Sequence, residues 1–112
     1  MQDLVSLEKP ELIIVQGDTL SSYCGAMVAF LNQIPVAHVE AGLRTNNKWS
    51  PYPEEIFRKF NDALADIHFA ASDSAIANLK REGIKDSVYL TGNTGIDALM
   101  YMQRQILSLI HI

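Results

Sequence analysis

The sequence predicts an α/β protein built on a parallel sheet. Short apolar runs alternate with stretches of helical periodicity, and each run ends near a glycine or a small polar residue. No internal repeat or low-complexity tract interrupts this order. Strand–turn–helix units of this kind form parallel sheets with right-handed crossovers. Strands are expected at about residues 11–16, 36–39, 67–71 and 87–91, which is roughly half of a Rossmann-type sheet.

The first unit runs from an apolar strand into an amphipathic helix. The run Leu12–Val15 is rich in β-branched residues and favours a strand buried on both faces. It ends at Gly17, after which Asp18 or Thr19 can cap the next helix. The segment before Pro10 is expected to be the end of a helix. Apolar residues at helical spacing predict the helix that follows: Leu20, Tyr23, Cys24, Met27, Val28 and Leu31.

The second unit begins after a proline and contains a long loop. Pro35 precedes a short strand that Gly42 closes, and a polar loop with two further prolines leads to a helix from Glu54. Apolar side chains on one side of that helix are expected to face the core: Phe57, Phe60 and Leu64.

The last two units follow the same order. After the third strand, Ser72 is the expected cap of a helix through Arg81, which Gly83 ends. The fourth strand turns at Gly92 into a final helix that starts near Thr94.

Composition restricts the class of protein. Hydrophobic residues make up 48% and charged residues 20% of the 112 residues, as in soluble globular proteins. Nine basic residues against 13 acidic ones leave no basic surface for nucleic acid. The single cysteine, Cys24, excludes an internal disulfide and favours a reducing, cytoplasmic location. The apolar runs are too short to span a bilayer, so no membrane partner is expected.

Acidic residues mark the ends of the first two strands. Ligands of open parallel sheets bind beyond the carboxyl ends of the strands. Asp18 and Glu40 lie at two such ends, each beside a glycine. Asp18 can be a plain helix cap, whereas a glutamate at the end of a buried strand rarely lacks a partner or a function. The last strand leads to Asn93 and Thr94, where free amides can hold a phosphate, although any strand-to-helix turn needs the same residues.

A histidine lies two residues before Glu40. Strand alternation places His38 and Glu40 on the same face. A metal site formed by these two residues and Asp18 is conceivable. No further ligand spacing supports it, so no metal is predicted, and a hydrogen-bonded structural histidine is the favoured interpretation.

The loop at residues 50–55 carries paired glutamates into a helix. Two prolines stiffen this loop, so Glu54 can point into the crevice, while Glu55 is expected to face the other side of the helix start. The helix dipole alone would also favour both acids. Arg44 and Arg58 either form surface salt bridges or orient the carboxylates and bind anions. The residues alone therefore predict a ligand-binding α/β half-domain with at least three carboxylates near one crevice.

Four ordered segments resemble the non-hydrolysing UDP-N-acetylglucosamine 2-epimerases of bacteria and archaea. The second segment is the most specific, and the similarity extends from about Pro10 to about Gln103. One departure is Phe57, which precedes Arg58 where the family usually has asparagine. The four segments are Val15–Thr19, His38–Thr45, Ser50–Glu55 and Thr91–Leu99.

The resemblance implies a glycosyltransferase-B-like architecture, with an active site between two Rossmann-like domains. Residues 1–92 would form the second half of the N-terminal domain, and residues 93–112 the start of the interdomain helix. The C-terminal domain would be absent. The tail at residues 107–112 departs from the family's continuation and can be non-native, so His111 is given no role.

The resemblance also implies a reaction. UDP-N-acetylglucosamine and UDP-N-acetylmannosamine would interconvert by elimination of UDP and its re-addition with inversion at C2. No cofactor is implied; the substrate is a UDP-sugar, the parent protein a homodimer, and its pathway cell-envelope polysaccharide synthesis. The catalytic carboxylates fall by motif on Asp18, Glu40 and Glu54. Weaker substrate-binding candidates are His38, Arg44, Arg58, Asn93 and Thr94.

Three other functions remain open from the sequence. A hydrolysing epimerase would release UDP and free N-acetylmannosamine. A glycosyltransferase-like protein would bind a nucleotide sugar, although such binders do not require the run His38–Thr45. The chain could also be a folded or partner-binding unit with no activity of its own.

Overall fold

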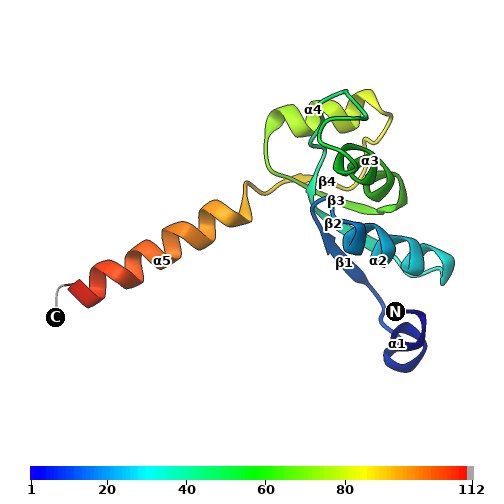
Figure 1. Ribbon diagram of the computed structural model, residues 1–112, viewed down its shortest axis with the longest axis horizontal. Coiled ribbons are helices and arrows are strands. Elements are labelled where there is room, and N and C mark those ends of the chain that lie inside the picture. Colours follow the sequence, from blue (N-terminus) through cyan, green and yellow to red (C-terminus); the bar gives the residue numbers. More distant parts are fainter. Residues whose placement is uncertain (111–112) are drawn as a thin grey trace.

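A four-stranded parallel sheet forms the centre of the computed structural model, which describes residues 1–110 (Figure 1). The strands lie side by side in chain order. The predicted fold class and all four predicted strands are confirmed, with bounds that differ by one or two residues. The strands are β1 Ile13–Gln16, β2 Val36–Ala41, β3 Ile67–Ala70 and β4 Val88–Leu90.

In the described part of the chain, five helices accompany the sheet: α1 Gln2–Glu8, α2 Leu20–Leu31, α3 Glu54–Leu64, α4 Asp73–Arg81 and α5 Thr94–Ile110. Of the two candidate caps of α2, the structure uses Thr19, whose hydroxyl accepts from the Ser22 amide at 3.1 Å. This leaves the Asp18 carboxylate free for other partners. Ser72 caps α4 as expected, through a 3.2 Å bond from the Ala75 amide.

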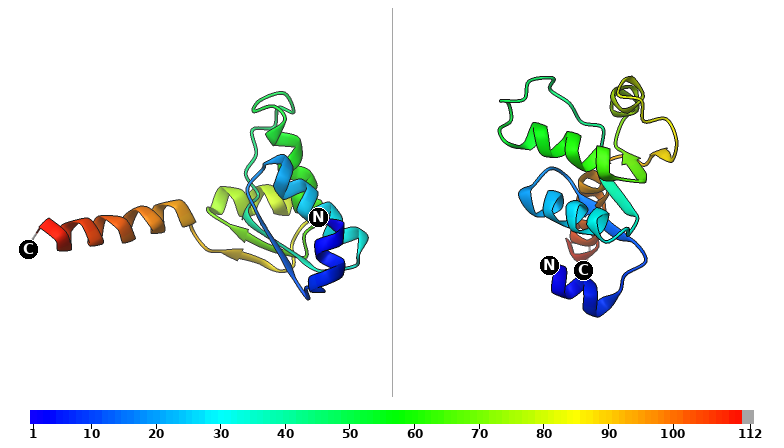
Figure 2. Two further views of the ribbon diagram at one scale, coloured as in Figure 1. Left: turned by 60° about the horizontal axis from the view of Figure 1, so that its bottom comes forward. Right: turned by 90° about the vertical axis from the view of Figure 1, so that its right-hand side faces the viewer.

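Helices α2, α3 and α4 cover one face of the sheet, and α2 and α3 lie side by side (Figure 2). The rings of Phe57 and Phe60 pack against Tyr23 of α2, with centroid distances of 5.5 and 5.4 Å. Two small apolar clusters seal this face. One contains Val15, Ala26, Ala29 and Val36, and the other Ala41, Ala70, Ala75 and Leu79.

The opposite face of the sheet has no helical layer among residues 1–110. Burial alternates along β1, so that Val15 is buried while Ile14 is 63% exposed. On β4, Tyr89 is 53% exposed and lies against Phe69. The expectation that the first strand is buried on both faces is therefore wrong, because the helices of residues 1–110 cover only the face of the sheet that carries Val15.

Helix α5 projects from the rest of the molecule (Figure 1). Its 17 residues include no buried side chain, and at about 1.5 Å per residue it is about 26 Å long. The predicted domain boundary at residues 92 and 93 falls at the turn before this helix, and the assignment of the two parts to domains stays a prediction. Residues 107–110 continue α5, whereas His111 and Ile112 lie outside the described residues.

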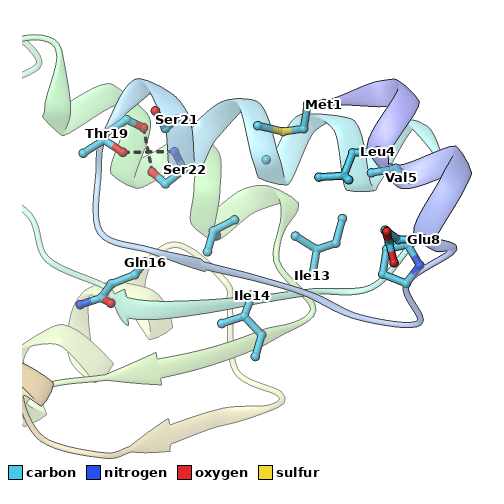
Figure 3. A pocket seen from close by; sticks show the side chains of 13 residues that line it. Met1, Leu4, Val5, Glu8, Ile13, Ile14, Gln16, Thr19, Ser21 and Ser22 are labelled. Carbon is cyan, nitrogen blue, oxygen red and sulfur yellow. Dashed lines mark hydrogen bonds between the residues drawn. The ribbon is translucent and has the colours of Figure 1, made fainter.

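A largely apolar groove of about 580 Å³ lies between α1, β1 and α2 (Figure 3). It follows β1, which pairs with a strand on one side only. None of the three predicted catalytic carboxylates lines it. In the described part of the chain, no helix combines the length and apolarity needed to cross a membrane.

Candidate active site

The first two strands bring Asp18 and Glu40 to the same edge of the sheet, as predicted. Gln16 pairs with Val39, so Glu40 comes beside Gly17. Gly17 has φ +71°, and a Cβ on it would lie 3.2 Å from the Glu40 Oε2 atom. Glycine is thus favoured here by its backbone conformation, and its lack of a Cβ leaves room for the carboxylate.

Glu40 adopts an unusual backbone conformation. A β-bulge lies between Val39 and Ala41, and Glu40 itself has φ 72°. A non-glycine residue in this left-handed region costs about 1–2 kcal/mol. The bulge also interrupts the strict alternation expected between His38 and Glu40. The Glu40 side chain is half-buried and forms no hydrogen bond or ion pair with any of residues 1–110. Strain at an unpaired carboxylate is a feature of functional positions.

Arg58 holds Asp18 in place. Its Nε donates to the Asp18 Oδ2 atom at 2.8 Å, and its Nη1 donates to the Glu55 Oε2 atom at 3.2 Å. The Arg58 side chain is 17% exposed and that of Asp18 27%. Of the two interpretations of Arg58, the structure favours orientation of carboxylates over a surface salt bridge.

Glu55 is buried, which the sequence did not predict. Its carboxylate accepts from the Thr45 amide at 3.1 Å and from the Asn46 amide at 3.0 Å. Burial alone would raise the pKa of Glu55, but these two backbone N–H groups and Arg58 hold it below its usual value. Glu55 therefore stays ionised and anchors the loop that follows β2.

Glu54 occupies the first position of α3 and is half-buried. It forms no hydrogen bond with the other residues that the structure describes, and it lies one helical turn before Arg58. Its predicted catalytic function stays a prediction.

Asp62 is the centre of a buried network that sequence reasoning missed. Its Oδ1 atom lies 2.6 Å from His38 Nδ1, and its Oδ2 atom accepts from the Gly42 amide at 3.0 Å and from Arg44 Nη2 at 2.8 Å. Burial would raise the pKa of Asp62, but the hydrogen bond and charge of His38, and then those of Arg44, lower it. The available signal was spacing, because Asp62 falls one turn after Arg58 and two turns after Glu55 on one side of α3.

Arg44 is part of this network and is 1% exposed. Its Nε and Nη2 donate to the two carboxylate oxygens of Glu82 at 2.8 and 2.6 Å, and Nη1 donates to the Leu43 carbonyl. Burial lowers the pKa of Arg44, but Glu82 and Asp62 raise it above its usual value. Arg44 therefore forms a structural ion pair with Glu82 and Asp62, and its binding of substrate stays a prediction.

His38 is fully buried. Its Nδ1 contacts Asp62, and its Nε2 lies 2.8 Å from the Gly17 carbonyl oxygen. Both ring nitrogens are therefore engaged by the protein, which agrees with the interpretation of a hydrogen-bonded structural histidine, and binding of substrate by His38 stays a prediction. Among residues 1–110, no three side chains of His, Cys, Asp or Glu gather as metal ligands would.

Asn93 and Thr94 lie at the start of α5 and are exposed. The Asn93 side chain accepts from the Gly95 amide at 2.8 Å, as a helix cap does. The Thr94 hydroxyl lies 3.4 Å from the side-chain nitrogen of Gln16 at the end of β1. Both residues thus lie at the edge that carries Asp18, and their binding of substrate stays a prediction.

A family model described as UDP-N-acetylglucosamine 2-epimerase matches residues 1–111. The chain belongs to this family. The match includes most of the tail at residues 107–112. Solved structures of the family superpose on the chain. They confirm the fold class that the resemblance implies.

Three relatives illustrate the similarity. The UDP-N-acetylglucosamine 2-epimerase of Bacillus subtilis is 53% identical over 92 residues, which are 81% of this chain and 24% of the relative. The Neisseria meningitidis UDP-GlcNAc 2-epimerase, solved bound to UDP-GlcNAc, has a TM-score of 0.91 at 42% identity, over 94% of this chain and 29% of that one. The Methanocaldococcus jannaschii UDP-GlcNAc 2-epimerase, solved with UDP-GlcNAc and UDP, has a TM-score of 0.85 at 42% identity, over 89% and 27%. This epimerase-family chain spans about a quarter of the length of the curated relatives it matches.

Proposed function

We propose that this chain is the segment of a non-hydrolysing UDP-N-acetylglucosamine 2-epimerase that carries its sugar-directed carboxylates. The observation that supports this most directly is the arrangement at the sheet edge. Asp18 and Glu40 meet at Gly17, at the carboxyl ends of parallel strands, where ligands of such sheets bind. Two solved relatives are bound to UDP-GlcNAc, which supports a UDP-sugar as the substrate.

The proposed reaction needs carboxylates with unused acceptor atoms. A base removes the C2 proton, the electron pair forms the C1–C2 double bond, and UDP leaves C1 with the electrons of the C1–O bond. UDP then returns to C1 while a proton is delivered to the other face of C2. No net oxidation occurs, so the proposal includes no cofactor. Glu40 and Glu54 are the candidates for proton transfer, and Asp18, oriented by Arg58, supports positive charge at C1. A carboxylate that attacks a weakly acidic C–H needs a desolvated setting.

We also propose a location, an oligomeric state and a pathway for the parent protein. We place it in the cytoplasm, as a homodimer that supplies cell-envelope polysaccharide synthesis. Exposed large apolar side chains on α2 and α3 support self-association, among them Phe30 (57% exposed), Leu31 (68%) and Phe60 (45%).

A chimera tests the function. The aligned 92 residues of this chain replace their counterparts in the Bacillus subtilis relative, and the purified protein is incubated with UDP-GlcNAc in D₂O. The expected product is UDP-ManNAc that carries deuterium at C2, and its formation is measured by NMR. Release of free N-acetylmannosamine with UDP would instead show a hydrolysing enzyme, and an inactive chimera that still binds UDP would contradict the assignment of the carboxylates.

The 112-residue chain is the matched control. It is expected to give no conversion and no tight UDP binding, because positioning a substrate between two domains contributes about 7–11 kcal/mol to lowering a barrier. Carboxylates on a solvent-exposed surface also stay hydrated, and hydrated carboxylates are poor bases. Conversion by the chain alone would show that it is self-sufficient.

A further inference from the structure

Two buried histidines lie beside each other on neighbouring strands and have different hydrogen bonds. His38 of β2 pairs in register with His68 of β3. They are 0% and 3% exposed. His68 Nε2 lies 2.8 Å from the backbone carbonyl of Asp62, and its Nδ1 has no partner. A neutral ring with its proton on Nε2 satisfies that single bond.

His38 cannot satisfy its bonds in the neutral form. The Gly17 carbonyl oxygen, 2.8 Å from Nε2, only accepts hydrogen bonds. The Asp62 carboxylate, 2.6 Å from Nδ1, is also an acceptor, because its other oxygen receives N–H groups from Gly42 and Arg44. A neutral imidazole carries one N–H and the imidazolium two, so only the imidazolium makes both bonds.

The surrounding charges agree with an imidazolium. His38, Asp62, Arg44 and Glu82 form one connected cluster. With His38 protonated, the cluster holds two cations and two anions. The side chain of Glu82 is 34% exposed, so solvent also stabilises its negative charge, and the two hydrogen bonds of His38 carry the argument. The other ionisable groups near this cluster are His68 on β3, Asp18 and Glu40 at the Gly17 turn, and Arg58 and Glu55 of α3, of which Arg58 pairs with both Asp18 and Glu55.

The second bond of His38 reaches the candidate active site. The Gly17 carbonyl belongs to the peptide whose nitrogen is that of Asp18. The same oxygen accepts from Asn61 Nδ2 at 3.1 Å, so both of its lone pairs are used. The Glu40 carboxylate lies over Gly17. A rotation of this peptide would therefore move Asp18 and disturb the packing of Glu40.

We infer that His38 is a positioning residue that carries a proton on both ring nitrogens and so fixes the Gly17–Asp18 peptide beneath the two carboxylates. The effect of His38 on turnover rests on the proposed function. The protonation of His38 and its hydrogen bond to the Gly17–Asp18 peptide do not.

The protonation is tested on the chain labelled with ¹⁵N-histidine. His38 is expected to give the two-proton pattern at about pH 8, because both of its hydrogen-bond partners are acceptors. His68 is expected to give the neutral pattern in the same spectrum, and His68→Asn identifies its signals. A neutral His38 under these conditions overturns the inference.

The hold on the turn is tested by substitution. His38→Asn is expected to shift the Asp18 amide resonance, and His68→Asn, a matched buried substitution one strand away, is expected to leave it in place. Equal shifts in the two variants would overturn the positioning function. His38→Gln provides a second variant if the first fails to fold, and the protonation result on the unsubstituted chain is independent of both.

Turnover is measured in the chimera, per UDP-binding site. His38→Asn is expected to lower kcat about tenfold to a hundredfold, with KM little changed, because a small misplacement of a reacting group costs this much. His68→Asn is expected to lower at most the number of UDP-binding sites and to leave the turnover per site unchanged. Equal loss per site in both variants overturns the inference. If the unsubstituted chimera is inactive, the proposed function fails, while the two NMR results still decide the protonation and the hold on the turn.

Discussion

Two sets of carboxylates lie near the same end of the sheet, and the protein treats them differently. Glu55 and Asp62 are 0% and 1% exposed, and their oxygens accept from backbone amides and arginines. Glu40 and Glu54 are half-buried and have no hydrogen-bond partner among residues 1–110. The first set holds the loop after β2 in place, whereas the second leaves its carboxylate oxygens without a protein partner.

This difference supports the proposed division between structural and catalytic carboxylates. A buried carboxylate with a lowered pKa is stabilised as the anion, and such an anion is a weak base. A carboxylate without partners keeps all its acceptor positions for a substrate. Asp18 is intermediate, because Arg58 occupies one of its oxygens while its side chain stays 27% exposed.

Acidification should affect both buried carboxylates at once and give the largest loss of stability. The pKa values of Glu55 and Asp62 are lowered in the folded chain. Their stabilisation is complete above the unfolded values, near 4.3 and 3.9, and is lost as pH falls through the lower folded values. The urea midpoint of the chain should therefore fall steeply below about pH 4. The double variant Glu55→Gln/Asp62→Ala should show a flatter profile, and an identical slope would contradict the assignment.

Removal of the central carboxylate should be the most damaging single change. Asp62→Ala leaves Arg44 and His38 without their shared buried partner, and breaking such a pair costs about 3–5 kcal/mol. Urea unfolding measures the loss. Asp86→Ala, at an exposed position, is the control and should change stability by less than about 0.5 kcal/mol. Similar losses in both variants would show that the network contributes little.

The backbone part of the network is tested at two glycines with nearly equal φ angles. Gly42 has φ +84°, its amide donates to Asp62, and a Cβ would lie 2.4 Å from the Ala75 carbonyl oxygen. Gly83 has φ +86° and no atom within 4 Å of a Cβ. Gly83→Ala should cost about 1 kcal/mol for the backbone conformation alone, and Gly42→Ala about 2–4 kcal/mol because overpacking adds to it. Equal midpoints in urea would show that α4 can move away from Gly42.

These contrasts also show what the sequence could predict. Apolar periodicity and glycine positions predicted the four strands, the cap at Ser72 and the common edge of Asp18 and Glu40. The burial of Glu55 was not predictable from the same signals, because the helix dipole explains a glutamate in a first turn equally well. Asp62 lies in the last turn of α3, where neither apolar periodicity nor a glycine marks it. The burial of both residues depends on partners far away in the sequence, such as His38 and Arg44. Likewise, strand alternation predicted that Glu40 shares a face with His38, but the β-bulge between Val39 and Ala41 interrupts this alternation.

The smallest change in stability is expected where the largest change in turnover is proposed. Glu40→Gln keeps the size of the side chain and its backbone conformation, and no hydrogen bond to the described residues is lost. The urea midpoint should therefore correspond to a change of less than about 0.5 kcal/mol, while the chimera should lose about a hundredfold or more in turnover. Asp18→Asn and Glu54→Gln should behave similarly in turnover.

Glu55→Gln is the counterpart, because its amide group would face N–H donors of Thr45, Asn46 or Arg58. It should lose about 1–3 kcal/mol of stability and much less turnover per UDP-binding site. If Glu40→Gln unfolds the chain while Glu55→Gln abolishes turnover, the division between structural and open carboxylates is reversed.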